Sequence, residues 1–403
     1  MTDRLYYDDA YCRSFDAVVT SCREAKDGGW NVALDRSAFY PTSGGQPFDT
    51  GILQADGAES RVTDVEADRE GEVWHRTERE FLPGTRVRGE IDWERRLDHM
   101  EQHAGEHMLA GAVWEKLGGT TIGLHLGQED SSIDISMPEE RTRLTEEEIR
   151  MLEDLVNRRI REDAPIRCWF PDEEELKTLP LRKPPTVKEH VRIVAMGDFE
   201  MVACGGTHPA STGRIGLIKI LSAAPSKGKV RVTFVCGGRA CRLFQHYMRC
   251  ADKAGNVLSA PTDKLAAAAG ELKKRLSETE RRLHLLESDR ILREIQEAES
   301  GEDLRGVILS AVTLPEEDNT PLSAAVSKWI GEGGRILLLS AGERLLFARS
   351  EDVDLDMGTL IRRVARGGGR PDWASGAGVP ECVGVARKIL MTEGKGKTWR
   401  KRN

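Results

Sequence analysis

The segment Arg95–Leu117, RRLDHMEQHAGEHMLAGAVWEKL, determines how the rest of the chain is interpreted. Its two histidines, His103 and His107, are four residues apart, a spacing that places both imidazoles on one face of a helix, one turn apart. Apolar residues, among them Trp114, lie near the same stripe, so we expect this face to point into the protein. Gly118 provides a stop signal. Taken alone, the segment also fits a packed helix with two hydrogen-bonded imidazoles.

A second pair of candidate ligands lies in the stretch Cys204-Gly-Gly-Thr-His208, where the two glycines allow a tight backbone turn. Together with His103 and His107, this pair offers three imidazoles and one thiolate. Such a set suits Zn²⁺, a borderline-soft ion that prefers four ligands. Neither segment is specific by itself, but the two together predict one zinc ion per chain.

Length and composition bound the class of protein. A chain of 403 residues is too long for one ordinary core, so we expect two to four domains. The sequence contains no apolar run of about 18 residues, and its acidic, aromatic N-terminus lacks the profile of a signal peptide. We therefore expect a cytoplasmic protein with no membrane partner. The eight scattered cysteines fit a reducing compartment.

The net charge of −8 gives no argument for nucleic-acid binding, but its distribution is uneven. From Met357 onward, arginines and lysines outnumber the acidic residues, and the chain ends in the basic tail KGKTWRKRN. This basic end fits a local phosphate-binding patch, and it fits a solvated tail equally well.

Residues 1–90 contain short, partly alternating apolar runs separated by Gly, Asp and Pro, a pattern typical of a small β-barrel. Within them lies the loop FYPTSGGQP, with two glycines that permit close approach of the backbone to a ligand. The polar side chains of Thr42, Ser43 and Gln46 flank these glycines and could read a hydroxyl or an amine. As a lone signal the loop is weak, because most such stretches are hairpin turns.

The rest of the chain separates into three parts. Residues 91–238 mix the histidine helix, a hairpin in TTIGLHLGQEDSSIDISM, an amphipathic helix near 145–163 and further strands, which predicts an α+β domain. Residues 239–300 are helical, with a coiled-coil seam that favours an oligomerisation or spacer helix. The seam consists of Leu265, Ala269, Leu272, Leu276, Thr279, Leu283 and Leu286. Residues 301–403 return to short strands with helices between them, which predicts an α/β domain.

The motifs MEQHAGEHML, MGDFEMVACGGTHPASTGRIGLIKI and FYPTSGGQP resemble the editing domain of alanyl-tRNA synthetase, and more closely the free-standing AlaX alanyl-tRNA editing proteins. The segment GGGRPDWASGAG resembles the C-terminal domain that long-form AlaX proteins share with the synthetase and with DHH-type phosphoesterases. The resemblance covers nearly the whole chain. It implies a multidomain α+β protein with a translation-factor-like barrel (1–90), a zinc-dependent editing domain (91–238), a helical segment (239–300) and a DHH-associated-type domain (301–403).

The resemblance also implies a function: a trans-acting hydrolase that removes serine, and secondarily glycine, from mischarged tRNA-Ala. It assigns zinc to the two ligand pairs and the aminoacyl end of the tRNA to the glycine-rich loop. Gln46 and Glu106 are the candidate catalytic residues, although Glu106 fits a surface or supporting carboxylate equally well and stands where synthetase editing domains commonly have Thr. The remaining candidates are Thr42, Ser43, Gly44, Gly45 and Gln46 for the substrate, Gly367, Gly368, Gly369 and Arg370 for tRNA, and a homodimer through the helical and C-terminal parts.

The expected chemistry follows from selectivity. A synthetase pocket built for a methyl group cannot strongly exclude a side chain that adds a hydroxyl, so a second site is needed. In that site, polar groups placed for the serine hydroxyl stay unpaired with alanine, at a cost of roughly 1–3 kcal/mol each. Because the sequence offers four protein ligands, we favour a zinc that positions the substrate, with activation of a water molecule as the second reading.

Three other functions are weighed against this one. His103-Ala-Gly-Glu106-His107 has the H-x-x-E-H form of a zinc peptidase, but such enzymes normally take a carboxylate as third ligand. A DHH-type nuclease requires an Asp-His-His core, and Asp98-His99 stands alone. A non-catalytic RNA-binding protein with a structural zinc is the third alternative.

Overall fold

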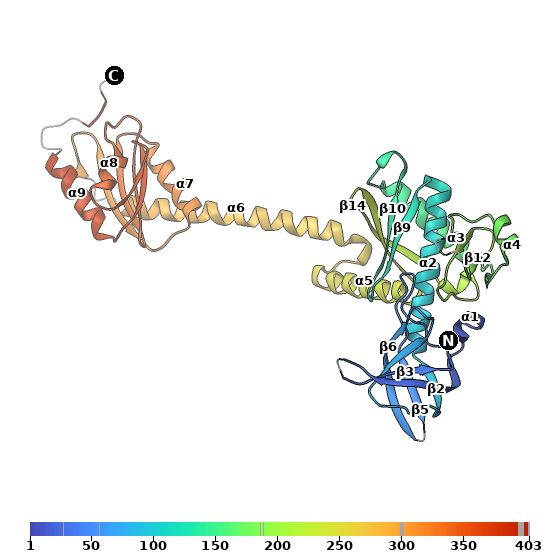
Figure 1. Cartoon of the computed structure of the whole chain (residues 1–403). Helices are drawn as coiled ribbons and strands as arrows, with labels where there is room; N and C mark the ends of the chain where they lie inside the picture. Colours follow the sequence, from blue (N-terminus) through green and yellow to red (C-terminus); the bar gives the residue numbers. More distant parts are fainter. Residues whose placement is uncertain are drawn as a thin grey trace. The chain divides into compact units, whose positions relative to one another are not determined.

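The structure is a computed structural model that describes residues 1–403 except 27, 56, 186, 188, 299–301, 394–398 and 402–403. Most of the predicted basic tail therefore lies outside the described residues. The chain forms two compact units, Met1–Cys250 and Ala251–Asn403 (Figure 1). The predicted multidomain α+β architecture is confirmed, whereas the boundaries of the four predicted domains stay a prediction.

The first unit begins with the predicted barrel, which six strands close in the order β2-β3-β7-β6-β5-β8. Alternate residues point inward, as β7 shows with Val73, His75 and Thr77 buried. The barrel strands are β2 (Ser14–Glu24), β3 (Trp30–Leu34), β5 (Gly51–Ala55), β6 (Ala58–Ala67), β7 (Val73–Thr77) and β8 (Arg86–Ile91). The short elements β1 (Asp3–Arg4), α1 (Leu5–Asp8) and β4 (Arg36–Ser37) accompany it.

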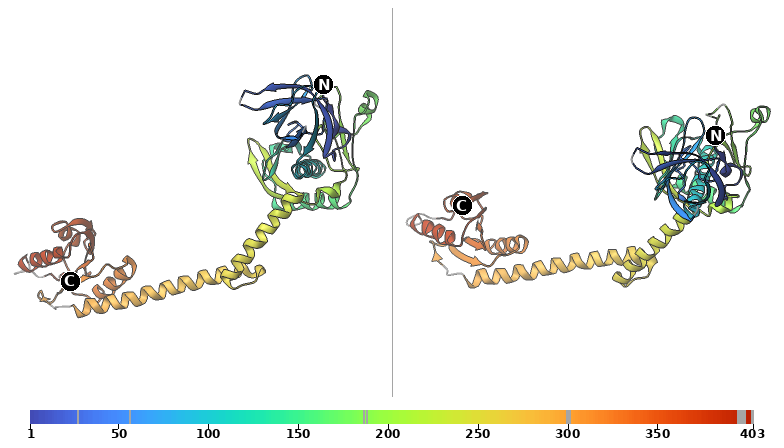
Figure 2. Two further views of the ribbon diagram at one scale, coloured as in Figure 1. Left: turned by 90° about the horizontal axis from the view of Figure 1, so that it is seen from below. Right: turned by 60° about the horizontal axis from the view of Figure 1, so that its bottom comes forward.

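Helix α2 (Trp93–Leu117) leaves the barrel and runs through the centre of the first unit. The Asp92 side chain caps its start by accepting a hydrogen bond from the backbone N–H of Arg95, and Gly118 ends it with a φ of 64°. The left view of Figure 2 looks along this helix and shows it between the barrel and the sheet layer. Because neighbours lie on several sides, most residues from His99 to Val113 are buried.

Trp114 is expected near the buried stripe of this helix. This expectation is wrong, because Trp114 is 49 % exposed. Close packing of the helix instead depends on its glycines. A Cβ atom at Gly105 would come within 2.1 Å of the Cys236 sulfur, and one at Gly111 within 2.6 Å of a Glu200 carboxylate oxygen. Glycine is therefore the residue that allows the sheet layer to approach α2 at these points.

Two antiparallel sheets and two helices complete the first unit. The larger sheet has the order β14-β15-β10-β9, and the smaller has the order β11-β12-β13. The strands are β9 (Thr120–Leu126), β10 (Ser131–Ser136), β11 (Ile166–Trp169), β12 (Ile193–Met196), β13 (Glu200–Ala203), β14 (Ile218–Ser226) and β15 (Lys229–Cys236). The predicted hairpin is confirmed as β9 and β10. Short 3-10 turns occupy Pro138–Glu140 and Thr212–Ile215.

The predicted amphipathic helix is confirmed as α3 (Glu146–Arg161). It begins with a capping box, in which the Thr145 hydroxyl accepts from the Glu148 N–H and the Glu148 carboxylate accepts from the Thr145 N–H. Its buried side chains, Leu152, Leu155, Val156 and Ile160, belong to the core between α2 and the larger sheet. A short helix, α4 (Glu173–Thr178), follows β11.

The predicted helical region consists of α5 (Gly237–Leu258), the 3-10 turn Thr262–Lys264 and α6 (Leu265–Glu297). In the single chain the seam residues Leu272, Leu276, Leu283 and Leu286 of α6 are more than half exposed. Coiled-coil pairing through this seam stays a prediction.

The second unit contains a six-stranded mixed sheet of order β16-β17-β18-β19-β21-β20 with helices on both faces (Figure 1). Its elements are β16 (Glu302–Asp303), β17 (Ile308–Leu314), α7 (Asn319–Ile330), β18 (Arg335–Ala341), β19 (Arg344–Arg349), α8 (Met357–Arg362), β20 (Arg366–Gly369), β21 (Trp373–Ala377) and α9 (Glu381–Glu393).

The glycine-rich segment of the second unit begins as a strand. Gly367 to Gly369 lie in strand β20 and pair with β21, and only the residues after them turn. A Cβ atom at Gly367 would come within 2.6 Å of the Ser375 carbonyl oxygen, and one at Gly369 within 2.3 Å of the Trp373 carbonyl oxygen. Close approach of two strands thus accounts for these glycines.

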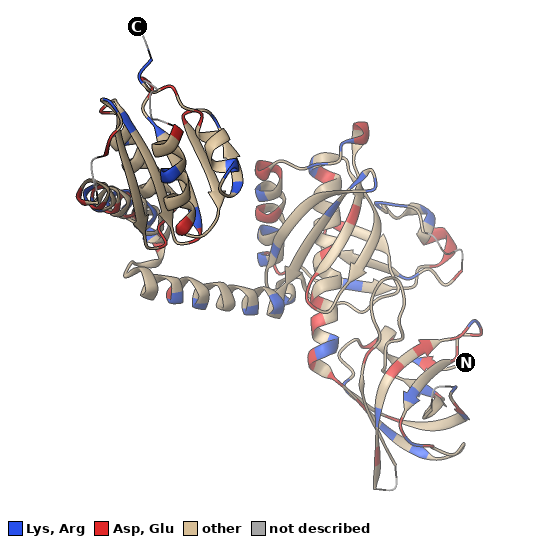
Figure 3. Ribbon diagram, turned by 90° about the vertical axis from the view of Figure 1, so that its left-hand side faces the viewer, with Lys and Arg blue, Asp and Glu red and all other residues tan. Residues whose placement is uncertain are grey.

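Basic and acidic residues are interspersed along the ribbon in the view of Figure 3 and do not separate into two sides. Among the helices in the described part of the chain, none is both long enough and apolar enough to span a membrane.

We predict that the barrel loses stability in acid because of His75. This buried imidazole contacts the Ser37 hydroxyl at 2.7 Å and the Val32 carbonyl at 2.9 Å, and burial lowers its pKa to about 4. Since the unfolded chain binds this proton near pH 6.5, the contribution is present above that pH and is lost as the pH falls towards 4. The expected loss is about 3 kcal/mol.

The measurement is hydrogen exchange of the β3 and β7 amides at pH 7.5 and pH 5. A His75→Gln variant, which cannot titrate, should show a smaller difference between the two conditions. Equal differences in the two proteins would contradict the prediction.

Candidate metal centre and substrate pocket

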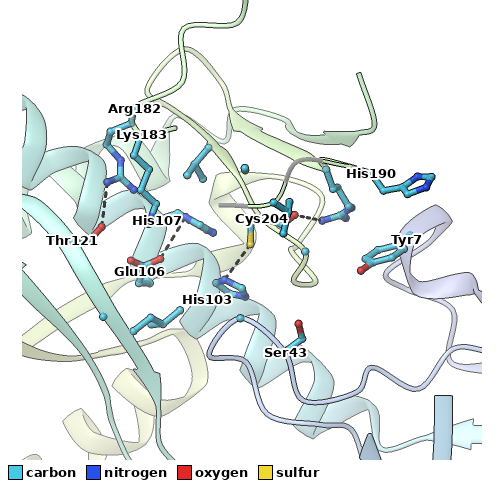
Figure 4. A pocket seen from close by; sticks show the side chains of 18 of the residues that line it. Tyr7, Ser43, His103, Glu106, His107, Thr121, Arg182, Lys183, His190 and Cys204 are labelled. Carbon is cyan, nitrogen blue, oxygen red and sulfur yellow. Dashed lines mark hydrogen bonds and ion pairs between the residues drawn. The ribbon is translucent and has the colours of Figure 1, made fainter. Parts of the chain in front are cut away.

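The structure brings together the four ligands predicted from two distant segments. The ligand atoms of His103, His107, Cys204 and His208 all lie within 4.8 Å of one another. The Cys204 sulfur is 3.4 Å from Nε2 of His103 and 3.4 Å from Nε2 of His208. Helix α2 supplies the first two ligands, and the segment that follows β13 supplies the other two (Figure 4).

This cluster has the properties of a site that could hold a metal ion. Nε2 of His107 is buried and has no hydrogen-bond partner among the described residues. Buried polar atoms normally have partners, so this nitrogen is available to an added ligand. Three nitrogens and one sulfur match the donors that bind borderline-soft divalent ions.

The electrostatics of the cluster also favour a cation. Burial lowers the pKa of His103 to about 3 and lowers the pKa values of His107 and His208 well below the usual value. The imidazoles are therefore neutral, the form that binds metal. Desolvation raises the pKa of the Cys204 thiol to about 12. A thiolate here requires a nearby positive charge, which a bound metal ion supplies.

Gln46 lies behind His103 and holds its ring. The Gln46 Oε1 accepts from the Thr207 N–H at 3.0 Å, which identifies that atom as the amide oxygen, and it lies 2.8 Å from Nδ1 of His103. His103 must therefore donate from Nδ1, which leaves the lone pair of Nε2 directed to the cluster. The Gln46 Nε2 donates to the Thr207 hydroxyl at 2.8 Å, so both ends of the amide are occupied.

The loop around Gln46 is fixed by a buried ion pair. The guanidinium of Arg96, from the first turn of α2, donates to both carboxylate oxygens of Asp49 and to the carbonyl oxygens of Ala10 and Ala38. Both members of the pair are fully buried. The Asp49 carboxylate also accepts from the Tyr40 N–H at 2.7 Å. These contacts attach the glycine-rich loop to the same helix that carries two of the ligands.

The tip of the loop is a hairpin turn closed by Ser43 and Gln46, which exchange backbone hydrogen bonds. Gly44 and Gly45 form the turn with φ angles of 57° and 88°, the left-handed region that favours glycine. Ser43 and Gly44 line the pocket described below. The Thr42 hydroxyl accepts from the Phe48 N–H at 3.2 Å, and neither Thr42 nor Gln46 is among the lining residues.

The glycines of the second ligand segment have a different role from the expected tight turn. Neither Gly205 nor Gly206 has a positive φ. A Cβ atom at Gly206, however, would come within 2.2 Å of the His103 ring. Glycine at this position therefore allows the segment to pass directly over the first ligand.

His103, His107 and Cys204 line a cavity of about 490 Å³, within the size range of small-molecule sites. Glu106, which is buried, lines this cavity beside His107, with a carboxylate oxygen 3.4 Å from Nδ1 of that residue. Burial raises the pKa of Glu106 to about 7, although Arg182 and Lys183 act in the opposite direction.

Sequence reasoning missed much of the rest of the lining. The missed residues include Tyr7, Thr121, Phe170, Arg182, Lys183, His190 and Arg192. They are single residues from separate elements, without motif spacing. The adjacent basic residues Arg182 and Lys183, which precede the second ligand segment in the sequence, are a signal of a binding site for an anionic group.

Two arginines give the cavity rigid walls. Arg182 donates from Nε to the Glu200 carboxylate at 2.9 Å and from Nη1 to the Thr121 hydroxyl at 3.2 Å. Arg192 donates from Nη1 to the carbonyl oxygens of Cys204, at 3.1 Å, and Gly206, at 2.8 Å. The second arginine thus holds the backbone of the segment that carries two ligands.

Other candidates lie elsewhere. Gly367 to Gly369 and Arg370, the candidate tRNA contacts, belong to the second unit. The Arg370 side chain is 77 % exposed and lies 3.4 Å from the Asp372 carboxylate.

The barrel, the buried helix and the His/Cys cluster define a class of protein related to aminoacyl-tRNA synthetases. Residues 6–95 match the family model of class II (A) tRNA synthetases. Residues 191–233 match the family model of the second additional domain of threonyl- and alanyl-tRNA synthetases, and they include the second candidate ligand pair, Cys204 and His208.

Whole-chain relatives identify the family. The alanyl-tRNA editing protein AlaX-L of Pyrococcus horikoshii is 32% identical over 398 residues, which cover 93% of this chain and 94% of that protein. The chain therefore belongs to the AlaX-L family of alanyl-tRNA editing proteins. The alanine–tRNA ligase of Pyrococcus furiosus is 34% identical over 390 residues, and the match spans 42% of the ligase.

Among solved structures, RecJ of Thermus thermophilus in complex with Mn²⁺ matches 35% of this chain and 21% of its own length, with 14% identity. The TM-score of 0.26 is too low to assign a shared fold.

We predict that Gln46→Ala lowers metal affinity by about 10- to 100-fold, because His103 loses the acceptor that orients its ring. Cys204→Ala should lower the bound metal more strongly, since it removes a ligand. The measurement is a competition titration with a chromophoric chelator on the full chain.

Gln245→Ala is the matched control, because Gln245 is exposed on α5. This variant should retain the affinity of the unmodified protein. Unchanged metal content in Cys204→Ala would show that the four residues do not share one ion.

Proposed function

We propose that this chain hydrolyses the ester that joins a wrong amino acid to tRNA-Ala, with serine as the main substrate and glycine as the second. The observation that carries the proposal is the convergence of three imidazoles and one thiol, of which His103, His107 and Cys204 line a cavity that Glu106 also lines. The name of the full-length relative, alanyl-tRNA editing protein, supports the same activity.

We propose zinc as the ion of the cluster, one per chain. The donor set supports zinc over magnesium or calcium, which prefer oxygen ligands. When bound, zinc would supply a positive charge that orders the four side chains and polarises a nearby oxygen. The unpartnered Nε2 of His107 supports this assignment.

In the proposed reaction, the oxygen of a water molecule bonds to the ester carbonyl carbon, and the bond from that carbon to the ribose oxygen breaks. One water proton ends on the ribose hydroxyl, and the products are the free amino acid and tRNA-Ala. We assign proton removal from water to Glu106, because its carboxylate lies in the cavity next to a ligand. The backbone of Gly44 reaches the same cavity and is available to the substrate.

Selection against alanine is assigned to polar groups that meet the serine hydroxyl. Ser43 is the member of the glycine-rich loop whose side chain lines the cavity, while the Thr42 hydroxyl and the Gln46 amide have partners within the protein. We therefore assign the hydroxyl contact to Ser43, and we assign to Gln46 the role of positioning His103.

The partner in this proposal is mischarged tRNA-Ala. In the second unit, Arg370 is the candidate residue for RNA contact, since the three glycines before it are paired in a strand. The exposed leucine seam of α6 supports a homodimer through this helix and the C-terminal part.

Two alternative functions, a zinc peptidase and a non-catalytic RNA-binding protein, differ from the proposed one in the reaction that the cavity would support. A zinc peptidase of the H-x-x-E-H type would use Glu106 in the same way but would cleave peptides. A non-catalytic RNA-binding protein would bind tRNA without releasing amino acid. The full-length relative and the cysteine among the ligands favour the ester hydrolase.

We predict that the full chain deacylates seryl-tRNA-Ala faster than glycyl-tRNA-Ala and leaves alanyl-tRNA-Ala largely intact. Ser43→Ala should reduce the ratio of the serine to the alanine rate by about 5- to 100-fold, because it removes one partner of the hydroxyl. The measurement is release of labelled amino acid from the three substrates. Cleavage of a generic peptide without deacylation would favour the peptidase.

We predict that Glu106→Gln lowers kcat by about 100- to 10,000-fold, the range for loss of a general base, with metal content unchanged. Glu115→Gln is the matched control, because Glu115 is exposed on the same helix. Full activity in Glu106→Gln would remove this residue from the reaction and leave a supporting role.

We predict that dialysis against a zinc chelator abolishes deacylation and that stoichiometric Zn²⁺ restores it, whereas Mg²⁺ does not, because the donors are nitrogen and sulfur. The measurement is the deacylation rate together with the metal content of the same sample. Full activity in a metal-free sample would contradict the assignment of a functional metal.

A further inference from the structure

The cavity has two chemically different ends. In Figure 4, Glu106, Thr121, Arg182 and Lys183 lie on one side of the Cys204 sulfur. At this end the contacts are polar, with the Thr121 hydroxyl accepting from Arg182 and the Glu106 carboxylate subject to the charges of both basic side chains.

The opposite end is aromatic. Tyr7 and His190 lie there in Figure 4, and Phe170 lines the same cavity. The rings of Tyr7 and Phe170 meet edge to face, with centroids 5.6 Å apart and an interplanar angle of 78°. The Arg192 guanidinium lies 5.1 Å from the centre of the Tyr7 ring. These four residues come from separate parts of the first unit and line the same cavity.

The aromatic end is both fixed and open. Arg192 is buried, and its hydrogen bonds to the ligand segment hold it in place. A Cβ atom at Gly205 would lie 3.6 Å from the Tyr7 hydroxyl, so this ring stands beside the Cys204 segment. Phe170, in contrast, is 50 % exposed, and His190 is exposed. Two ring systems are thus accessible beside a supported tyrosine.

We propose that this end binds the terminal nucleoside of the tRNA, with its base stacked on Phe170 and His190. The inference rests on the proposed function, because it takes the substrate to be an aminoacyl ester of a ribose. Such an ester has a small polar amino acid on one side of the reacting carbonyl and a planar base on the other. The two ends of the cavity, separated by the ligand cluster, match these two parts.

The reverse orientation fits the side chains poorly. A serine or glycine residue presents no π face to the aromatic mouth, and a nucleoside at the other end would place its base against the buried Glu106 carboxylate. Stacking is also tolerant of base identity, since every base has a π face. This end therefore contributes affinity, whereas amino-acid selection stays with Ser43, as proposed above.

The test uses the zinc-loaded full chain and a stable adenosine analogue in which an amide replaces the seryl ester. Phe170→Ala should weaken binding of this analogue, and raise the KM for seryl-tRNA-Ala, by about 5- to 100-fold, the range found when a stacking ring is removed. The value of kcat and the ratio of serine to alanine rates should not change. Phe170→Tyr should restore affinity, and Phe244→Ala, at an exposed ring on α5, should have no effect.

Two outcomes overturn the inference: unchanged affinity of Phe170→Ala for the analogue, or a changed ratio of serine to alanine rates in that variant. The second of these outcomes requires that the unmodified protein deacylates seryl-tRNA-Ala. Failure of the unmodified protein to do so would instead overturn the proposed function, and tight binding of the analogue that depends on Phe170 would still support a nucleoside site.

Discussion

The amide of Gln46 is the point on which the organisation of the first unit depends. Its oxygen accepts hydrogen bonds from a ring nitrogen of His103 and from the backbone of Thr207, so a barrel loop, a helix and the second ligand segment meet at one atom. A buried amide oxygen with two donors is well satisfied, whereas loss of the amide would leave both donors unpaired in the interior. The Arg96–Asp49 ion pair supports this point by fixing the loop to the helix.

Burial sets the charge states of the imidazoles and the thiol in the cluster. The imidazoles are neutral because protonation in the interior is unfavourable, and a thiolate is unfavourable there without a neighbouring cation. The four side chains could hold a metal ion, and such an ion would stabilise the thiolate. Close packing of the cluster depends in turn on a glycine, since a side chain at Gly206 would collide with His103.

For the glycine-rich loop, the sequence motif predicted the position of the loop but not the role of each side chain in it. The motif located the loop at the site, but it could not separate Ser43, which lines the cavity, from Gln46, which faces the protein. Side chains on the two sides of a hairpin turn point to different surroundings, and only the packing of α2 against the barrel decides which surroundings those are. Tyr7 and Phe170 could not be found from the sequence, because each is a single aromatic residue whose neighbours come from other elements.

The sequence by itself determined the local features: the spacing within each pair of candidate ligands, the alternating pattern of the barrel segment and the Gly118 stop of α2. Each depends on spacing or on contacts between residues a few positions apart, which the order of residues specifies directly. The tertiary structure alone decided which side of His103 is held by Gln46, why the glycines at 105, 206 and 367 are required, and that the cavity has a polar and an aromatic end. These features depend on contacts between segments separated by many residues, and such contacts are set by how whole elements pack.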